Sequence, residues 1–449
     1  RLDAVTQDVA DKYFKEKPVL THGITLGIKN ILETKKVQVL ITGKKKSGIV
    51  KKIAESGKTN SIPATLIKNN ENVEFIIDKE ASCLLINEED IMEKTKVAII
   101  GCGFIANIHM ESYERFVPDA KVVAVCGRNG EKAKAFAEQH GIENYYDDLD
   151  VMLEESDCEV VDICIPNYAH YEACMKAAKS GRHVIVEKPI ALTLEQADEM
   201  IAACKEAGKL LMYAEELCFA PKYERVRMLV EHGAVGKLYM IKQAEKHSGP
   251  HSRWFYEAKY AGGGVMMDMG CHALAWFRWI LGGNPKVKSV YASMATVMHD
   301  TECEDNTVTM VEFENGVLGV AEDSWAKHGG MDDRIEVYGD KGVSYADLFR
   351  GNSALTYSVD GYDYAMEKAG SSKGWTFTVF EEAFNQGYPQ ELAHFIDCVR
   401  NGTKPIVTGE DGRAVLEIIY AAYESARTGK KVALPFEPKV TKPIDLWLK

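Results

Sequence analysis

Three polar residues in two short segments of the chain could carry out proton transfer. Lys188 belongs to the segment 184–189, Val-Ile-Val-Glu-Lys-Pro, in which an apolar, strand-like run ends at the lysine. A lysine at the end of a buried strand must be paired or have a lowered pKa, so we expect it to have a task there. The alternative is a surface lysine whose aliphatic stem covers apolar neighbours while its ammonium reaches water.

Asp268 and His272 follow a glycine triplet in the segment 262–272, Gly-Gly-Gly-Val-Met-Met-Asp-Met-Gly-Cys-His. A separation of four residues places both side chains on one face of a helix. A carboxylate beside an imidazole can orient it and raise its basicity, which suits a general base. The alternative is an aspartate that stabilises a helix N-terminus and a histidine that is satisfied in the core.

A glycine-rich turn at 101–106 predicts a binding site for a dinucleotide. It fits the pattern G-x-G-x-x-G/A, directly after a buried strand and before a helix. Glycines allow a tight turn and a close backbone approach, and the amides of the helix N-terminus face the anion. Similar turns also join strands to helices without binding anything. The turn residues are Gly101, Gly103, Phe104, Ile105 and Ala106.

The residues after the next strand bear on the choice between NAD and NADP. An acidic residue there bonds the ribose 2′-hydroxyl of NAD, but this strand ends Val-Cys-Gly-Arg-Asn at 125–129. Gly127 occupies the acidic position and Arg128 follows it. A guanidinium can hold a 2′-phosphate, so the sequence favours NADP. The alternative is that Arg128 is solvated surface.

Alternating elements position these residues. Strand-like runs at 96–100, 121–126, 160–165, 183–186 and 210–213 alternate with helical patterns, which predicts an α/β fold with a parallel sheet wrapped by helices. After residue 216, runs with alternating polarity predict a large, mostly antiparallel sheet with one solvated face. The latter runs are 287–299, 306–314, 317–325 and 335–338, and helical signal returns at 391–401 and 409–428.

The composition excludes several classes of protein. The chain has 449 residues, 46% of them hydrophobic, and a net charge of −13. This length predicts two to four domains. The acidic balance argues against nucleic-acid partners, and neither a polybasic patch nor a long apolar run indicates a membrane. Eleven scattered cysteines without a C-x-x-C pair indicate reduced thiols, a cytoplasmic protein and no metal site.

The glycine turn, Glu187-Lys188-Pro189 and the spaced set Gly262-Gly-Gly264, Asp268 and His272 together resemble the Gfo/Idh/MocA oxidoreductase family. The resemblance covers about 94–435. It implies a Rossmann domain and an α/β domain with a mostly antiparallel open sheet. It also implies an NAD(P)-dependent dehydrogenase of sugars or polyols such as inositols, and a homo-oligomer, either dimer or tetramer.

The resemblance also implies roles for individual residues. His272 would be the general base, Lys188 would stabilise the reacting oxygen, and Asp268 would fix the substrate or the histidine. Further cofactor-binding residues are Ile165, Pro166, Asn167, His170, Glu187 and Lys188.

A loop before the glycine triplet suits a sugar substrate, because it combines aromatic rings with polar donors. Packing residues are the alternative for its aromatics, and its arginine could also serve an acidic or phosphorylated substrate. The loop holds His247, His251, Arg253, Trp254 and Tyr256, of which the last three are the predicted substrate-binding residues beside Lys188, Asp268 and His272.

Two other functions fit the same fold. One is a redox-neutral glycoside-cleaving enzyme with a tightly held nicotinamide, and the other is a non-catalytic sensor that binds the dinucleotide. Retention of the three candidate catalytic residues argues against the sensor.

The first ninety residues resemble the C-terminal portion of glucosamine-6-phosphate deaminases. The resemblance rests on segments at 20–27, 39–46, 62–66 and 75–78, and it implies phosphate binding by Lys45 or Lys46. A solvated turn is the alternative for these lysines, and the deaminase catalytic segments are absent. We therefore expect three parts, a partial deaminase-like segment at 1–91, a Rossmann domain at 92–216 and a substrate domain at 217–449. Because the first residue is Arg1, we expect the chain to begin inside a domain.

Overall fold

The computed structural model describes residues 28–85, 93–282, 284–349, 353–358, 374–379 and 382–448. It divides into two compact units, Arg1–Glu93 and Lys94–Lys449, each described by itself below. The segment 20–27, on which part of the deaminase resemblance rests, and Arg1 lie outside the described residues. The three-part division into 1–91, 92–216 and 217–449 stays a prediction.

The first unit contains a two-stranded parallel sheet and a helix between its strands. β1 (Val37–Ile41) pairs in parallel with β2 (Val73–Ile77), and α3 (Ser47–Glu55) lies between them in sequence. Short helices α2 (Ile28–Leu32) and α4 (Lys79–Ser82) complete the unit.

The lysine turn of this unit, Lys44–Lys46, is exposed. The Gly43 amide donates to the Asp78 carboxylate at 2.8 Å, and the Lys44 amide donates to Glu80 at 3.2 Å. Two backbone donors of the turn therefore already have acidic partners. Phosphate binding by Lys45 or Lys46 stays a prediction.

The second unit begins with the predicted parallel sheet. Its six strands have the order β5-β4-β3-β6-β7-β8, and all neighbours are parallel. The order reverses between β3 and β6, which opens a crevice for ligands at the carboxyl ends of the strands. The strands are β3 (Thr95–Ile100), β4 (Ala120–Cys126), β5 (Asn144–Tyr146), β6 (Val160–Ile163), β7 (His183–Val186) and β8 (Leu211–Tyr213).

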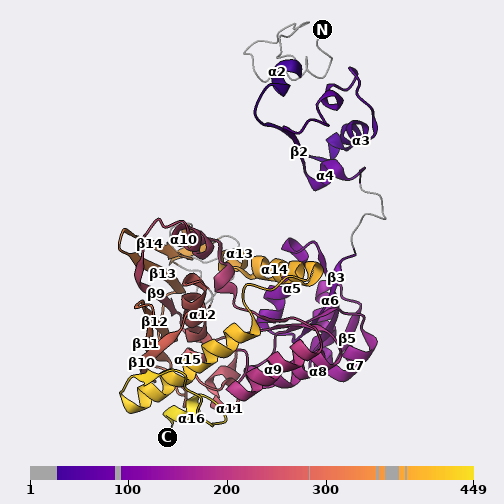
Figure 1. Cartoon of the computed structure of the whole chain (residues 1–449). Coiled ribbons are helices and arrows are strands. Elements are labelled where there is room, and N and C mark those ends of the chain that lie inside the picture. The colour runs from indigo at the N-terminus through magenta and orange to yellow at the C-terminus, as the bar shows by residue number, and fades with distance from the viewer. Residues whose placement is uncertain are drawn as a thin grey trace. The chain divides into compact units, whose positions relative to one another are not determined.

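Helices cover this sheet, as Figure 1 shows. The central strands β3 and β6 are buried along nearly their whole length because both faces are covered, which explains their continuous apolar runs. The helices are α5 (Phe104–Phe116), α6 (Gly130–His140), α7 (Leu149–Glu155), α8 (His170–Lys179) and α9 (Leu194–Glu206).

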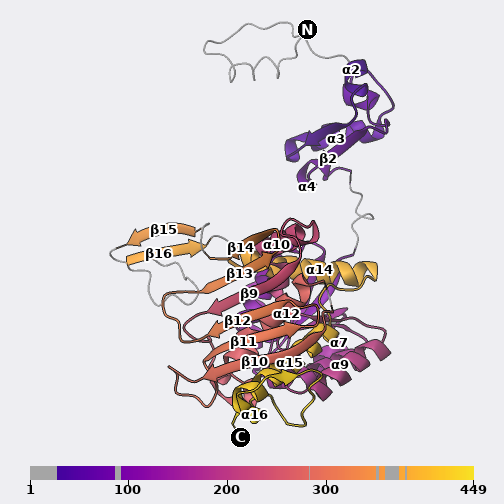
Figure 2. The same cartoon turned by 60° about the vertical axis from the view of Figure 1, so that its left-hand side comes forward.

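The second sheet has seven strands in the order β14-β13-β9-β12-β11-β10-β17 and is mostly antiparallel, as expected; only the β9–β12 pair among these is parallel. Figure 2 shows the sheet with α12 and α15 behind it. Burial alternates along β11, which matches one covered and one open face. The elements are β9 (Leu238–Lys246), β10 (Val287–Ala295), β11 (Asn306–Phe313), β12 (Leu318–Ser324), β13 (Asp332–Gly339), β14 (Gly342–Asp347), β17 (Val432–Ala433), α12 (Cys271–Ile280) and α15 (Gly409–Thr428).

Shorter elements complete the described part of the unit. No helix within the described ranges has the length and apolar character that crossing a membrane requires. All eleven cysteines are free thiols. The remaining elements are α10 (Pro221–Glu231), α11 (Ala258–Ala261), the antiparallel pair β15 (Ser353–Ser358) and β16 (Gly374–Val379), α13 (Glu382–Gln386), α14 (Tyr388–Asn401) and α16 (Ile444–Trp447).

Candidate active site

The glycine turn after β3 leaves an open cradle for a diphosphate. Gly101 has φ +120°, and a Cβ there would lie 2.2 Å from the Cys164 carbonyl oxygen, so no side chain is tolerated. A Cβ on Gly103 would meet no atom within 4 Å. Helix α5 begins at Phe104 without a side-chain cap or an acidic residue in its first turn. Its first amides are therefore free to receive an anion, and the turn fits the diphosphate of a dinucleotide.

A single cavity of about 690 Å³ runs from this turn to the second sheet. Its size suits a ligand pocket. It is lined by thirteen of the predicted site residues, namely Gly101, Gly103, Phe104, Ile105, Arg128, Ile165, Pro166, Asn167, Glu187, Lys188, Trp254, Asp268 and His272. Four other predicted residues do not line it, and these are Ala106, His170, Arg253 and Tyr256.

One end of the cavity lies beside the end of β4, where a carboxylate would read an NAD ribose. A Cβ on Gly127 would lie 2.7 Å from the Cys102 sulfur, so this position has no room for an acidic side chain unless Cys102 moves. Arg128 lines the cavity and donates from Nη1 to the Tyr168 hydroxyl at 2.9 Å. Lys132 also lines this end.

Lys188 follows β7 of the parallel sheet, Asp268 lies in the helical turn Met266–Gly270 before α12, and the two form an ion pair in the cavity. The Lys188 ammonium donates to the Asp268 carbonyl oxygen at 2.7 Å and to Oδ1 at 3.1 Å. Burial by itself would lower the pKa of Lys188, but Asp268 and neighbouring acids raise it well above its usual value. The Trp325 indole donates to Asp268 Oδ2 at 3.0 Å. Lys188 is therefore a fixed cation, and the surface-lysine alternative does not fit its position.

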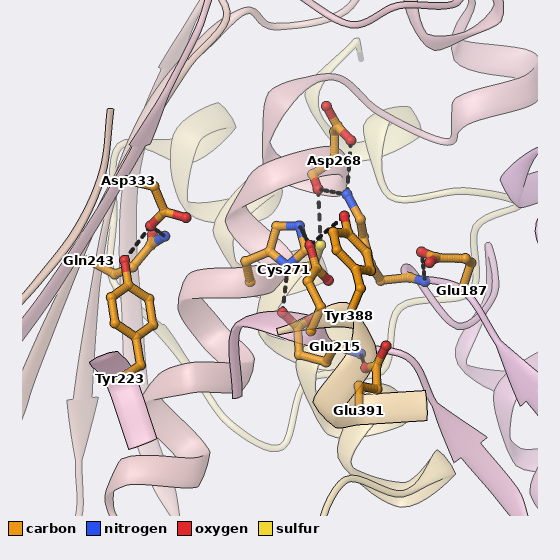
Figure 3. A network of polar contacts seen from close by, with 12 residues as sticks. Glu187, Glu215, Tyr223, Gln243, Asp268, Cys271, Asp333, Tyr388 and Glu391 are labelled. Carbon is orange, nitrogen blue, oxygen red and sulfur yellow. Dashed lines mark hydrogen bonds and ion pairs between the residues drawn. The ribbon is translucent and has the colours of Figure 1, made fainter. Parts of the chain in front are cut away.

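Glu215, which the sequence analysis did not single out, is a hydrogen-bond partner of His272. Residues Met266–Gly270, which include Asp268, form a π-helical turn before α12, the helix that carries His272. His272 Nδ1 lies 2.5 Å from Glu215 Oε1. Figure 3 shows Asp268 and Glu215 on opposite sides of this network.

The protonation of this pair follows from its burial. Burial lowers the pKa of His272 to about 4, against the nearby charge of Glu216, and burial raises the pKa of Glu215 to about 8. The imidazole is therefore neutral near pH 7. When Nδ1–H donates to Glu215, Nε2 keeps its lone pair, and Nε2 lies 3.8 Å from Glu216 Oε1.

A second buried network holds the segment that carries Lys188. His109 Nδ1 lies 2.9 Å from Asp162 Oδ2, and His109 Nε2 forms an ion pair with Glu187 Oε1 at 3.1 Å. Burial alone would favour the neutral imidazole, but Asp162, together with Cys164, raises the pKa of His109 well above its usual value. His109 is thus a buried cation between two carboxylates.

The four predicted residues outside the cavity have packing or backbone contacts. Both ring nitrogens of buried His170 face carbonyl oxygens, Pro189 at 2.9 Å and Ile165 at 2.7 Å, so His170 ties two cavity loops together. Burial lowers the pKa of His170, and the neutral ring has one N–H for these two acceptors. Tyr256 packs edge-on against Trp325. Arg253 and Ala106 lie off the cavity wall.

Sequence reasoning missed several residues of the site. Glu215 and Glu216 follow β8 directly, at the same sheet edge as Glu187 and Lys188, and that placement was a usable signal. Tyr388, which donates to Glu216 Oε1 at 3.0 Å, lies 172 positions away and gave no local signal.

Two buried groups in the described ranges bring possible metal ligands within 4.8 Å of one another, namely His109, Asp162 and Cys164, and Glu215, Cys271 and His272. Burial raises the pKa of both cysteines well above the usual thiol value, which disfavours the thiolate a metal requires. Their histidine–carboxylate contacts fit hydrogen-bonded networks.

A Rossmann sheet whose glycine turn opens on a cavity shared with a second, mixed sheet defines a two-domain, dinucleotide-binding oxidoreductase. Family comparison agrees with this class. Residues 95–215 match the oxidoreductase family's NAD-binding Rossmann fold, and residues 227–434 match its C-terminal alpha/beta domain. The chain belongs to the Gfo/Idh/MocA oxidoreductase family.

Curated relatives align with the second unit over nearly their full length. D-glucoside 3-dehydrogenase of Escherichia coli (strain K12) is 30% identical over 357 residues, which cover 76% of this chain and 97% of that protein. Myo-inositol 2-dehydrogenase of Thermotoga maritima is 29% identical, with 76% and 98% covered. The solved structure of GenD2 from gentamicin A biosynthesis, in complex with NAD, matches with a TM-score of 0.73 at 30% identity, covering 77% of this chain and 98% of that chain.

Proposed function

We propose that the chain is an NAD(P)-dependent dehydrogenase that transfers a hydride between a sugar or polyol carbinol carbon and nicotinamide. The observation that carries the proposal is the convergence of Lys188, Asp268 and His272 on a cavity that also contains the glycine turn. The names of the relatives, which include glucoside and inositol dehydrogenases, support the substrate class.

His272 is the proposed proton acceptor. Oxidation of a carbinol needs a base at its hydroxyl while a dinucleotide bound at the glycine turn supplies the hydride acceptor. The neutral imidazole presents Nε2 toward the cavity because Glu215 holds Nδ1. A proton taken up at Nε2 would be stabilised by Glu216, 3.8 Å away.

Lys188 is the proposed stabiliser of the reacting oxygen. Its ammonium has three N–H donors, and two of them bind the carbonyl and carboxylate oxygens of Asp268. The third is left for the substrate hydroxyl, whose oxygen gains negative charge as the proton leaves. A fixed, buried cation at that oxygen lowers the barrier because it needs no reorganisation.

NADP is the proposed preferred cofactor. Gly127 removes the carboxylate that would repel a 2′-phosphate, and Arg128 and Lys132 line the same end of the cavity. Arg128→Ala should lower kcat/KM for NADP⁺ at least tenfold and leave that for NAD⁺ within about threefold. Equal losses with both cofactors would contradict this preference.

A homo-oligomer formed through the open sheet face is also proposed. Apolar and aromatic side chains are exposed on the seven-stranded sheet, which marks a surface suited to association. They are Tyr239, Val308, Val343 and Tyr345. Light scattering coupled to size-exclusion chromatography distinguishes a monomer from a dimer or tetramer.

The main experiment is a screen for reduction of NAD⁺ and NADP⁺ at 340 nm with inositols, hexoses, glycosides and sugar phosphates. A substrate should be oxidised by the wild type, and Lys188→Met and His272→Asn should lose activity while still binding the cofactor. Turnover of a glycoside without added cofactor would instead identify the redox-neutral enzyme. Cofactor binding with no turnover of any compound would identify a sensor.

A further inference from the structure

The cavity wall on the side of the second sheet contains carboxylate groups that the proposed hydride transfer does not require. Glu216 and Glu245 both line the cavity, and they are only 5% and 6% exposed. Glu216 accepts the Tyr388 hydroxyl at Oε1, but its Oε2 has no hydrogen-bond partner. Glu245 Oε2 has none either. Two deeply buried carboxylates, each with one oxygen that has no hydrogen-bond partner, therefore belong to residues of the cavity wall.

Strand pairing places Glu245 in the middle of an acidic row. On neighbouring strands, Asp323 of β12 and Asp333 of β13 are both the cross-strand partners of Glu245 on β9. All three are buried. Asp333 accepts the Tyr223 hydroxyl at 2.5 Å, as Figure 3 shows, whereas neither carboxylate oxygen of Asp323 has a partner. Like charges directly opposite each other destabilise a sheet, so this row has a cost that the fold does not recover by itself.

Cations near the row are already engaged. The pKa of Glu245 is raised well above its usual value, mainly by burial and further by the charges of Asp333, Asp323 and Glu216. The charge of Lys188 opposes this rise. Lys188 is bound to Asp268.

The side chain of Lys246, the next residue along β9, also lies outside the acidic row. It pairs with Glu322 at 2.6 Å, and Glu322 is the β12 neighbour of Asp323, so its side chain points to the other face of the sheet. Within the described part of the chain, none of the three row carboxylates therefore forms an ion pair, although the charge of Lys246 favours ionised Asp323 from a distance.

An organic ammonium group has the properties that this wall lacks. It brings one positive charge and three N–H donors, which match unpartnered carboxylate oxygens, whereas a neutral hydroxyl brings one donor and no charge. An inorganic cation fits less well, because among the described residues these carboxylates are not among the groups whose ligand atoms converge within 4.8 Å.

We propose that the substrate is an amino sugar or aminocyclitol whose protonated amine is bound by Glu245 and Glu216. This inference rests on the proposed function and narrows its substrate class. The amine lies at the second-sheet wall, away from the reacting carbinol, which Lys188 and His272 contact. Binding of the ammonium favours the ionised carboxylates, so amine binding should release protons and should tighten as pH rises through neutrality.

The test is calorimetric binding to the cofactor-loaded enzyme, which does not depend on turnover. The probes are 2-amino-, 3-amino-, 4-amino- and 6-amino-deoxy-D-glucose, each compared with D-glucose, and scyllo-inosamine compared with myo-inositol. At least one amine should bind ten or more times tighter than its hydroxyl counterpart. Its binding heat should also vary between phosphate and Tris buffers because a proton is released.

Two glutamate substitutions separate recognition from general electrostatics. Glu245→Gln should reduce the amine preference to less than threefold without lowering the melting temperature. Glu322→Gln, a matched change on the outer face of the same sheet, should leave the preference unchanged.

Two results would overturn the inference. In the first, each hydroxyl compound binds as tightly as its amine counterpart. In the second, Glu245→Gln keeps the wild-type preference for the amine over the hydroxyl compound. Failure of the proposed function would look different, because amines would then bind without any reduction of cofactor.

Discussion

Substitution of His109 by glutamine should destabilise the second unit more than any surface substitution, because His109 is the cation of a buried network. It lies 2.9 Å from Asp162 and 3.1 Å from Glu187, and its side chain is fully buried. Glutamine has a similar size and can still donate a hydrogen bond, but it has no charge. His109→Gln therefore leaves two buried carboxylates without their shared positive partner.

The magnitude follows from what remains around the two carboxylates. Removal of one partner of a buried ion pair costs about 3–5 kcal/mol. Asp162 keeps the Tyr113 hydroxyl at 3.0 Å, and Glu187 keeps the Lys188 amide at 3.0 Å, so we expect the lower end, about 3 kcal/mol. At roughly 2–4 °C per kcal/mol for a domain of this size, the melting temperature should fall by about 6–12 °C.

Tryptophan fluorescence during thermal and urea unfolding measures this loss. All six tryptophans follow residue 94, so the signal reports on the second unit alone. His140→Gln is the matched control, because His140 pairs with Glu114 at 3.3 Å near the surface of the same domain. Exposed pairs contribute about 0–1 kcal/mol, so this control should lower the melting temperature by less than about 4 °C.

A double variant distinguishes lost charge compensation from lost packing. Asp162→Asn added to His109→Gln removes one of the two unpaired charges, so the double variant should be more stable than His109→Gln alone. If the two losses add, or if His109→Gln melts within 2 °C of the wild type, the assignment of His109 as a compensating cation is wrong.

Three further predictions concern pH, cofactor and catalysis. Burial raises the pKa of Glu215 and Asp333 to about 8. A carboxyl group of this kind makes its full contribution to stability below the pKa that it has in the unfolded chain, and the contribution is lost as pH rises through 8. The pKa of His272 is lowered to about 4, so His272 does not change the free energy of unfolding above pH 6.5. Urea titrations should therefore show a free energy of unfolding that falls from pH 6.5 to 8, and the fall should be less steep in Asp333→Asn. Gly103→Val should weaken dinucleotide binding at least tenfold in calorimetry with an unchanged melting temperature, because its side chain would enter open space. His272→Asn should lower kcat by about 10²–10⁴-fold with unchanged cofactor affinity, and a loss below threefold would place the base elsewhere.

Local patterns were sufficient for the fold of the second unit. The central strands of the parallel sheet are continuous apolar runs, and the glycine turn lies where the first of them ends, so the apolar run and the glycine pattern together placed the cofactor turn. β9 was missed because its inward positions include Gln243 and Glu245, and polar residues inside a strand erase the alternation on which such predictions rest.

The contacts of the site could be predicted less well than its members. Lys188, Asp268 and His272 all line the cavity, but their partners depend on backbone geometry and on distant segments. The π-helical turn that separates Asp268 from His272 has no clear sequence signal, and Glu215 reaches His272 across 57 positions. The ion pair between Lys188 and Asp268 joins segments 80 positions apart, so it becomes visible only in the folded structure.

The acidic row links the stability prediction with the substrate proposal. Asp333 accepts the Tyr223 hydroxyl, but both oxygens of Asp323 and Oε2 of Glu245 have no hydrogen-bond partner. Burial of such carboxylates weakens the fold as pH rises. Functional sites are where such costs are retained, because a ligand offsets them only when it is bound. An ammonium ligand should therefore raise the melting temperature more at pH 8 than at pH 6.5, since more of the row is ionised at the higher pH. A neutral sugar should stabilise the enzyme equally at both pH values. An ammonium ligand that also did so would remove the reason to assign the row to substrate recognition.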